Sequence, residues 1–267
     1  MDTSDAGGMT YRGTTALITG ASSGIGEEFA ARFAERGADV VLVARREDRL
    51  RALATELESR YGVTATPLAH DLAAPGAAAT LRAELDARDI RVDTLIGNAG
   101  FGARGAFAEA DPARLDAMIQ LNVAALTAIT REFLPDLVAS GRGALVNIAS
   151  VVAYQPTPHM AVYGATKAFV LSFTEAIAYE TRDTGLRVLA LSPGSTATEF
   201  FEIAGAEEIA GRGMQSPAQV VETALRALDR RRTPPSVVSG AANAVAATLA
   251  GIVPRRVALG ASGRLLA

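Results

Sequence analysis

The chain has 267 residues, of which 49% are hydrophobic and 21% charged, and its formal net charge at pH 7 is −3. This much apolar material is enough for a core covered on both faces, which excludes disorder over most of the chain and favours one large α/β domain. A slightly acidic chain lacks the basic surface that binds nucleic acids or anionic bilayers, and a chain without cysteine can form neither a disulfide nor a thiolate metal site.

The two ends of the chain differ from its middle. Residues 1–12 are polar, acidic and glycine-containing and lack the basic start and apolar run of a secretory signal, which predicts a flexible leader. No stretch reaches the roughly 20 apolar residues of a membrane span, since the longest candidate, 241–253, contains an asparagine and stops at a proline. We therefore expect a cytoplasmic protein with one domain over 13–240 and a C-terminal extension, 241–267, that packs on this domain or on a neighbouring subunit.

Short apolar runs alternate with helical patterns along the chain. Strands are expected at Thr15–Thr19, Asp39–Val43, Val63–Leu68, Thr94–Ile96, Ala144–Ile148 and Arg187–Leu191, with a weaker seventh at Ser236–Val238. Helices are expected at Ile25–Glu35, Arg46–Arg60, Ala77–Arg88, Pro112–Ser140 and around His159–Asp183. Such apolar strands are typical of sheets buried on both faces, paired in parallel through right-handed crossovers. The expected fold is a Rossmann-like α/β doubly wound parallel sheet of about seven strands, with helices on both faces and its ligand crevice at the carboxyl ends of the strands.

A glycine-rich turn, Thr19–Gly26, follows the first strand and opens the first helix, which is the context that a dinucleotide-binding fingerprint needs. Gly20 permits the tight turn, Gly24 and Gly26 let the backbone approach a pyrophosphate and the sheet, and the helix start supplies free N–H groups. The structural alternative is that these glycines serve only the turn. The spacing, Gly-x-x-x-Gly-x-Gly, differs from the Gly-x-Gly-x-x-Gly of most Rossmann dehydrogenases.

The end of the second strand indicates which nicotinamide cofactor is used. Ala44 stands where an enzyme for NAD usually has an acidic side chain for the ribose 2′-hydroxyl, so NADP(H) is favoured. Arg45, and after it Arg46, suits a 2′-phosphate because a guanidinium donates in a planar pair, and Ser22 adds a hydroxyl. The alternative is that both arginines are solvated residues that cap the next helix.

Tyr163 and Lys167 lie four residues apart in a predicted helix, so their side chains share one face. A phenol with a pKa near ~10 is a poor base at neutral pH, but a nearby ammonium lowers that pKa by stabilising the phenolate. Tyr163 would then act as general base for alcohol oxidation and as general acid for carbonyl reduction.

Two further polar residues give this pair its weight. Ser150 ends the fifth strand at the crevice, where its hydroxyl can stabilise charge on a substrate oxygen, with a loop cap as the alternative. Asn122 stands inside a predicted helix, where asparagine is mildly unfavourable, which indicates a specific hydrogen-bonding task. The motif Asn98-Ala99-Gly100 follows the fourth strand.

These motifs fit one pattern together with Pro193-Gly194, which follows the sixth strand. The chain resembles the short-chain dehydrogenase/reductase family, in its compact single-domain branch, from about Thr14 to Arg231. The resemblance implies an oxidoreductase with a catalytic tetrad of Asn122, Ser150, Tyr163 and Lys167. It also implies that the lysine holds the nicotinamide ribose and that the asparagine main chain retains a water that relays protons.

The resemblance further implies a set of residues that contact the NADP(H) cofactor. These are Gly20, Ser22, Ser23, Gly24, Ile25, Gly26, Arg45, Arg46, Asp71, Leu72, Asn98, Ala99, Gly100, Tyr163, Lys167, Pro193, Gly194, Thr196 and Thr198. Asp71 with Leu72 is expected at the adenine, and the residues from Pro193 onward at the nicotinamide amide and nearby phosphate. Ser22 stands where the family usually has a basic residue, so the NADP(H) preference depends mainly on Arg45.

Several regions beside the motifs are candidates for the substrate pocket or for subunit contacts. Phe101, Tyr154, Gln155 and Met160 are pocket candidates, and so is the helical stretch Glu199–Gly213, which often acts as a lid in relatives. The alternative for each is placement in the core or on the surface. The long helices on either side of the fifth strand are apolar on more than one face, which favours a homodimer or homotetramer through them over burial in a large monomer.

The expected function is hydride transfer between NADP(H) and a small-molecule carbonyl or alcohol. Two alternatives remain open: a non-catalytic dinucleotide-binding regulatory protein, against which the complete tetrad argues, and a family relative that catalyses elimination or isomerisation. The substrate cannot be named from the sequence, because the pocket is built from loops.

Overall fold

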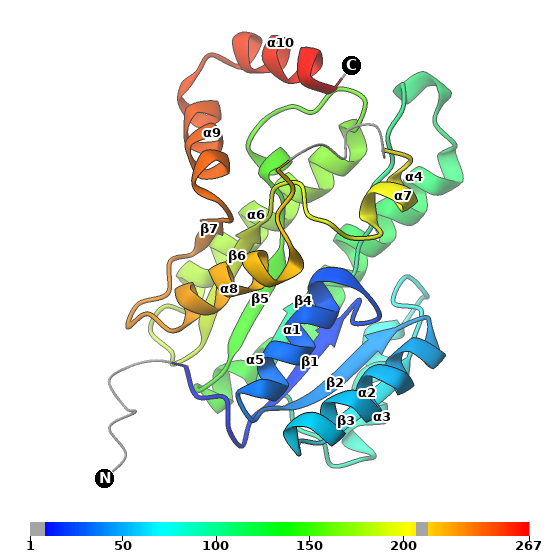
Figure 1. Ribbon diagram of the computed structural model, residues 1–267, viewed down its shortest axis with the longest axis vertical. Coiled ribbons are helices and arrows are strands. Elements are labelled where there is room, and N and C mark those ends of the chain that lie inside the picture. Colours follow the sequence, from blue (N-terminus) through cyan, green and yellow to red (C-terminus); the bar gives the residue numbers. More distant parts are fainter. Residues whose placement is uncertain (1–8, 207–212, 267) are drawn as a thin grey trace.

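The sheet at the centre of the protein has seven parallel strands in the order β3-β2-β1-β4-β5-β6-β7 (Figure 1). The computed structural model describes residues 9–206 and 213–266. The strands are β1 Thr15–Thr19, β2 Asp39–Ala44, β3 Ala65–Ala69, β4 Thr94–Gly97, β5 Ala144–Ile148, β6 Arg187–Ser192 and β7 Ser236–Val238. The doubly wound, Rossmann-like sheet predicted from the sequence is confirmed, and its winding reverses between β1 and β4, which pair directly.

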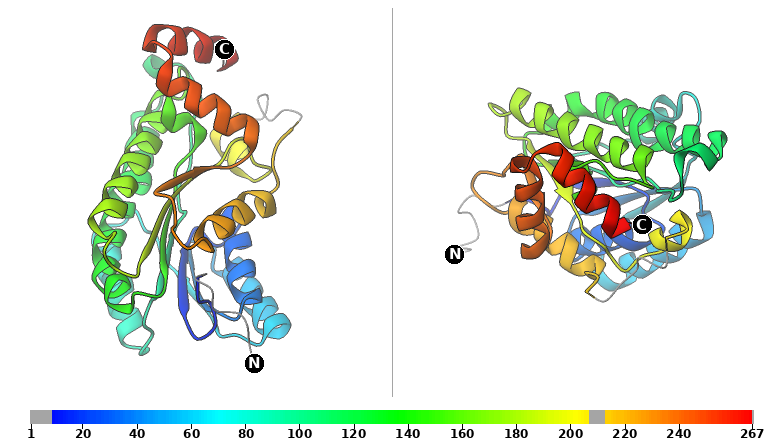
Figure 2. Two further views of the ribbon diagram at one scale, coloured as in Figure 1. Left: turned by 90° about the vertical axis from the view of Figure 1, so that its left-hand side faces the viewer. Right: turned by 90° about the horizontal axis from the view of Figure 1, so that it is seen from above.

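Helices cover both faces of the sheet (Figure 2). One face carries α1 Gly24–Glu35, α2 Glu47–Tyr61 and α8 Pro217–Leu228. The other carries α3 Ala77–Asp86, α5 Leu126–Ser140 and α6 Ala161–Glu180. The remaining elements are η1 Phe107–Glu109, α4 Pro112–Ile119, the π-helical η2 Gln120–Ala125, η3 Val151–Tyr154, α7 Phe200–Ala204, α9 Ala241–Ile252 and α10 Arg255–Leu266.

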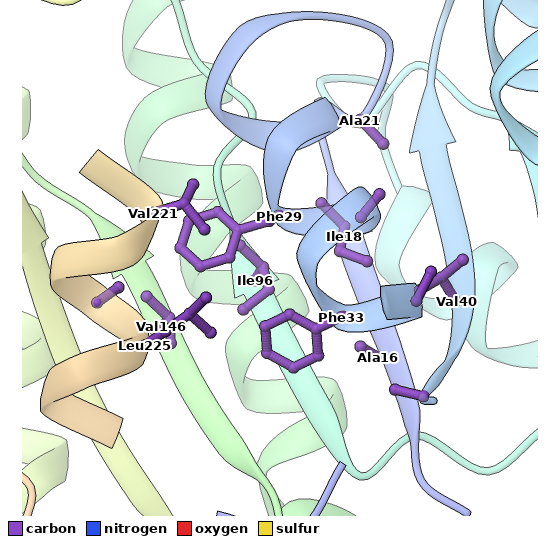
Figure 3. Close-up of a cluster of buried hydrophobic side chains, with 14 of the residues drawn as sticks. Ala16, Ile18, Ala21, Phe29, Phe33, Val40, Ile96, Val146, Val221 and Leu225 are labelled. Atoms are coloured by element: carbon purple, nitrogen blue, oxygen red, sulfur yellow. The ribbon is translucent and has the colours of Figure 1, made fainter. Parts of the chain in front are cut away.

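Each face of the sheet has its own apolar core because neighbouring residues of a strand point to opposite faces. Ile18 of β1 belongs to the core under α1 and α8, whereas the preceding Leu17 belongs to the core under α5. Figure 3 shows Phe29 and Phe33 of α1 lying between the strands and α8. Both phenylalanines are fully buried, which contributes about 1.5–3 kcal/mol each and holds the glycine-rich turn in front of α1 in place.

The structure differs from the sequence prediction mainly in the helices. The helix predicted over Pro112–Ser140 is interrupted by the π-helical η2. The helix predicted around His159–Asp183 begins only after His159, because this residue has a φ of +63°, which is outside the right-handed helical region. Helix α8 is absent from the prediction, although Ser216 and Gln219 form a capping box that signals its start.

Residues 9–12 and the C-terminal extension both pack on the domain. Residues 1–8 lie outside the described residues, but Met9 and Tyr11 are buried in the core, and Tyr11 donates a hydrogen bond to Asp229 at 3.0 Å. The leader prediction is therefore wrong for residues 9–12. The C-terminal extension forms two helices, α9 and α10, and Ser262 of α10 hydrogen-bonds the Pro156 carbonyl ahead of α6. Within the described residues, none of the helices has the length and apolar character needed to cross a membrane.

Candidate active site

A cavity of about 670 Å³ opens at the carboxyl ends of the strands. Nearly all residues predicted for the cofactor or the reaction line it. These are Gly20, Ser22, Ser23, Gly24, Ile25, Arg45, Arg46, Asp71, Leu72, Asn98, Ala99, Gly100, Ser150, Tyr163, Lys167, Pro193, Gly194, Thr196 and Thr198. The fold thus brings together residues from six strand ends. Gly26 and Asn122 do not line the cavity, and both contact residues that do.

The glycine-rich turn has the shape expected for approach to a phosphate. Gly20 and Gly24 have φ angles of +66° and +60°, in the left-handed region that favours glycine. A Cβ atom at Gly26 would lie 2.3 Å from the Gly20 carbonyl oxygen, so only glycine lets α1 start this close to β1. Ser23 is the N-cap of α1 but makes no side-chain capping bond, which leaves the first amides of the helix for another acceptor.

Asn98 fixes the glycine turn. Its Nδ2 donates to the carbonyls of Thr19 and Gly20 at 3.0 and 3.2 Å. The Thr19 hydroxyl in turn accepts hydrogen bonds from the amides of Asn98 and Ala99 at 2.9 and 3.0 Å. The side chain of Asn98, predicted to contact the cofactor, therefore also joins β1 to β4, and its loss would disturb the turn itself.

The two arginines after β2 have different surroundings. Arg46 Nη2 donates to the hydroxyls of Ser22 and Ser23 at 3.0 and 2.7 Å, and its Nη1 pairs with Glu199 at 2.7 Å. Arg45 lines the cavity but is exposed. Of the two, Arg46 is the arginine that the structure holds against the glycine turn, whereas sequence reasoning favoured Arg45.

Glu199 precedes α7 and joins it to the other side of the cavity. One carboxylate oxygen accepts from Arg46 and the other from Arg49, which lies 2.5 Å away. Hydrogen bonds from Arg49 and Arg46 lower the pKa of Glu199 to about 2, so it is ionised at neutral pH. The sequence includes Glu199 only as the first residue of the candidate lid and predicts no role for its carboxylate.

Tyr163 and Ser150 meet at the floor of the cavity. Their side chains are hydrogen-bonded, and both residues are buried, with 8% of each exposed. Burial raises the pKa of Tyr163 to about 12, against the smaller lowering by the bond from Ser150. This direction is opposite to the lowering expected from Lys167, and it means that the phenol is protonated at neutral pH in the chain without cofactor.

Lys167 lies one helical turn from Tyr163, as its spacing predicts. Its Nζ is 5.9 Å from the centroid of the Tyr163 ring and donates to the Ile148 carbonyl at 2.7 Å. Burial lowers the pKa of Lys167 to about 8. Both side chains project into the same cavity, which is the arrangement that shared acid/base work requires.

Asn122 lies in the π-helical η2, directly behind Gly100. Its Oδ1 accepts from the Phe101 amide at 3.1 Å, and its Nδ2 donates to the Phe101 carbonyl at 2.9 Å and to the Thr166 hydroxyl at 3.1 Å. The side chain therefore ties the segment after β4 to α6 beside Lys167. π-Helical turns often mark functional sites, because the extra residue frees backbone groups from the helical ladder.

The segment after β6 closes the cavity. The Thr196 hydroxyl donates to the Gly194 carbonyl at 2.9 Å. A Cβ atom at Gly194 would lie 2.2 Å from Nδ2 of Asn243, so this glycine lets α9 pack onto the end of β6. The same asparagine donates to the Ser239 carbonyl at 2.8 Å. The C-terminal extension thus supports the cavity wall from outside.

The side of the cavity next to Tyr163 is apolar. Tyr163 belongs to a cluster with Met118 and Met160, and the Phe200 ring lies 5.2 Å from its ring. Phe101 packs against the same cluster. Among the pocket candidates, Phe101 and Met160 line the cavity, whereas Tyr154 and Gln155 do not. Part of the predicted lid, 207–212, lies outside the described residues.

Comparison with known proteins identifies the family. The family model described as short chain dehydrogenase matches residues 14–208. The chain belongs to the short chain dehydrogenase family. The predicted family and the predicted enzyme class, an oxidoreductase, are confirmed.

Three relatives illustrate the match. A short chain dehydrogenase of Pseudocercospora fijiensis is 37% identical over 192 residues, 71% of this chain and 62% of that protein. Sulfoacetaldehyde reductase 2 of Chromohalobacter salexigens is 41% identical over 186 residues, 69% of this chain and 73% of that protein. A short-chain dehydrogenase from Sphingobium yanoikuyae, solved in complex with NADPH, is 38% identical with a TM-score of 0.79, covering 90% of this chain and 94% of that one.

As a short chain dehydrogenase, the chain has site residues that sequence reasoning missed. Asn243 supports the cavity wall from a segment that no motif marks, and Glu199 and Phe200 make contacts that the lid predicted for Glu199–Gly213 does not specify. His70 also lines the cavity and is 2.7 Å from Glu84. The available signals were weak: an acidic residue beside Thr198, and an asparagine in an otherwise alanine-rich helix.

Proposed function

We propose that this chain transfers a hydride between NADP(H) and a carbonyl or alcohol substrate. The observation that carries the proposal is the hydrogen-bonded pair of Ser150 and Tyr163 at the floor of the cavity, one helical turn from Lys167. The relative from Sphingobium yanoikuyae, solved with NADPH, supports NADP(H) as the cofactor.

The residues present fit this cofactor. The glycine turn offers the uncapped start of α1 to a pyrophosphate, and Arg46 with Ser22 offers donors to a 2′-phosphate. Bound NADPH supplies the hydride. The chain contributes the phosphate-binding turn, the arginine, and the closed wall formed after β6.

The protonated phenol suits reduction. As a carbonyl carbon accepts the hydride, its oxygen takes the proton from the Tyr163 hydroxyl, and the product is the alcohol. The Ser150 hydroxyl hydrogen-bonds the substrate oxygen while charge develops on it, and Lys167 stabilises the phenolate that remains. Asn122 holds the segment after β4 in register with α6, so its role is positional.

The apolar wall indicates the substrate class. Phe101, Met160 and Phe200 lie around Tyr163, so the group next to the reacting carbonyl meets mainly hydrocarbon. The guanidinium of Arg114, 5.6 Å from the Phe101 ring, is a charged group in this part of the lining. We therefore propose an aldehyde or ketone with an apolar substituent. Burial of such a group contributes about 25 cal/mol per Å² of apolar surface.

Replacing Tyr163 with phenylalanine tests the acid/base role. The change removes the only group in the proposal that exchanges a proton with the substrate, so turnover of NADPH with a carbonyl panel should fall by at least about 10²-fold. NADPH binding, followed by fluorescence titration, should stay within about threefold of the original, which is well under 1 kcal/mol. Retained turnover would refute the assigned role, and lost binding would point to a misfolded variant.

A further inference from the structure

Glu199 links two parts of the protein that are distant in sequence. Its carboxylate accepts hydrogen bonds from Arg46 and Arg49 at the start of α2, about 150 positions earlier in the chain. The next residue along, Phe200, begins α7, and the preceding Thr198 packs over the glycine turn, 2.8 Å from where a Cβ at Gly24 would lie. The carboxylate is therefore the electrostatic contact that holds the start of α7 against the cofactor end of the cavity.

Arg46 is shared between this carboxylate and the glycine turn. Its Nε and Nη2 donate to Ser22 Oγ at 3.1 and 3.0 Å, while Nη1 faces Glu199 at 2.7 Å. A carboxylate and a phosphate use a guanidinium in the same way, by accepting paired N–H bonds. A 2′-phosphate beside Ser22 would therefore meet a guanidinium that already carries one anion, and two anions at one guanidinium repel each other.

Arg49 provides a second place for the carboxylate. It is 2.5 Å from the other oxygen of Glu199, and Arg49 is more exposed than Arg46, with 51% against 39% of the side chain accessible. Glu199 can thus release Arg46 while it stays paired. The free energy needed to separate Glu199 from Arg46 would weaken the binding only of ligands that carry a 2′-phosphate.

The same segment reaches the reacting end of the cavity. The Phe200 ring lies 5.2 Å from the Tyr163 ring and covers Gly102, where a Cβ would meet it at 2.6 Å. A change in the contacts of Glu199 would therefore move the next residue, Phe200, whose ring packs on Tyr163.

We propose that Glu199 is a specificity-determining residue that competes with the cofactor's 2′-phosphate for Arg46, and so limits the preference for NADP(H) over NAD(H). This inference rests on the proposed NADP(H) function and adds a residue that opposes it. Without the carboxylate, Arg46 is free to bind the phosphate fully.

The change Glu199→Gln tests this competition by direct binding. Removing one charge next to the phosphate should tighten NADPH binding by about fivefold, while NADH binding changes by less than about twofold. Fluorescence titration of each reduced cofactor gives both constants without any turnover. Calorimetric titration with 2′,5′-ADP and with 5′-AMP repeats the comparison with probes that do not reach Tyr163.

Glu202→Gln is the matched control. It removes the same charge three residues further along the chain, within α7, but Glu202 is exposed and borders a neighbouring cavity of about 540 Å³. Its ratio of NADPH to NADH affinity should equal that of the original protein. Glu199→Ala, checked by circular dichroism, replaces the glutamine variant if that one does not fold.

The outcomes separate this inference from the proposed function. If the original protein prefers NADPH and Glu199→Gln increases that preference, the competition is supported. If the preference exists but stays the same or falls in this variant, or rises equally in Glu202→Gln, the competition is refuted and the proposed cofactor stands. The original protein could also bind NADPH no more tightly than NADH, and 2′,5′-ADP no more tightly than 5′-AMP. In that case the proposed cofactor fails, and the role of Glu199 fails with it.

Discussion

Two consecutive arginines at the end of β2 show how strongly a residue's role depends on the direction of its side chain. Arg45 and Arg46 have the same chemistry, but only Arg46 contacts the hydroxyls of Ser22 and Ser23. Arg45 is exposed at the edge of the same cavity. Since neighbouring residues after a strand leave it in different directions, the sequence alone assigns a phosphate role to the pair and not to either member.

Arg46→Ala should weaken NADPH binding by about 10-fold to 100-fold, because charge-assisted hydrogen bonds contribute about 1.5–3 kcal/mol. NADH, which has no 2′-phosphate, should bind nearly as before. Arg45→Ala is the matched control, with a loss below about threefold, since an exposed charge near a phosphate contributes little. Fluorescence titration of both cofactors measures all four effects. A larger loss of NADPH binding in the Arg45 variant would instead assign the 2′-phosphate to Arg45, as the sequence predicts.

At the scale of the element, α6 buries the proposed reactive pair, and burial of the charged lysine lowers the stability of the fold. The helix buries Tyr163 and Lys167 together, with 8% and 6% exposed. Ile148 O accepts a hydrogen bond from the lysine, and burial lowers the pKa of Lys167 to about 8 from its ordinary 10.5. A pKa lower in the folded than in the unfolded state means that the charged lysine destabilises the fold wherever it must remain protonated.

Lys167→Met should therefore stabilise the cofactor-free chain at pH 7 by about 1–2 kcal/mol, after the lost hydrogen bond to Ile148 O is subtracted. Below pH 8 the lysine is charged in both states, so the full penalty is present. Between pH 8 and 10.5 the unfolded chain binds more protons, the original protein gains relative stability, and the difference should shrink. Urea unfolding at pH 7 and pH 10 measures both values. A variant less stable than the original at pH 7 would contradict this reading.

At the scale of the whole molecule, the outer surface of α5 and α6 is the candidate subunit interface. Phe169 of α6 is 39% exposed and stacks on Phe173, with ring centroids 5.5 Å apart. Ile119, where α4 meets the π-helical η2, is 42% exposed. These positions agree with the proposal, made from the helical pattern, that a homodimer or homotetramer forms through the long helices.

Phe169→Glu should dissociate that assembly, since a charge buried in the centre of an interface costs at least about 2 kcal/mol. Size-exclusion chromatography with light scattering at micromolar concentration would show the lower mass. Phe107→Glu is the control, because Phe107 is 67% exposed but lies in η1, which belongs to neither α5 nor α6, and should leave the mass unchanged. An original protein that is monomeric at all concentrations would refute the interface.

Much of the site follows from local sequence. The glycine turn, Ser150 and the Tyr163–Lys167 spacing are predicted correctly to lie at one cavity, because each motif sits at a strand end or on one helical face, and parallel strands all present their carboxyl ends to the same edge. The sequence did not predict correctly that the pKa of Tyr163 is raised, because this shift depends on how much hydrocarbon surrounds the phenol, including Met160 and Phe200.

The sequence by itself determined the sheet, the glycine turn and the spacing of Tyr163 and Lys167, since hydrophobic periodicity and short motifs act over a few residues and need no knowledge of distant partners. Only the tertiary structure decided which arginine faces Ser22, that Glu199 reaches across the cavity, that Met9 and Tyr11 are core residues, and that Asn243 supports Gly194. These contacts join segments far apart in the chain, and their geometry arises from packing, which no local pattern encodes.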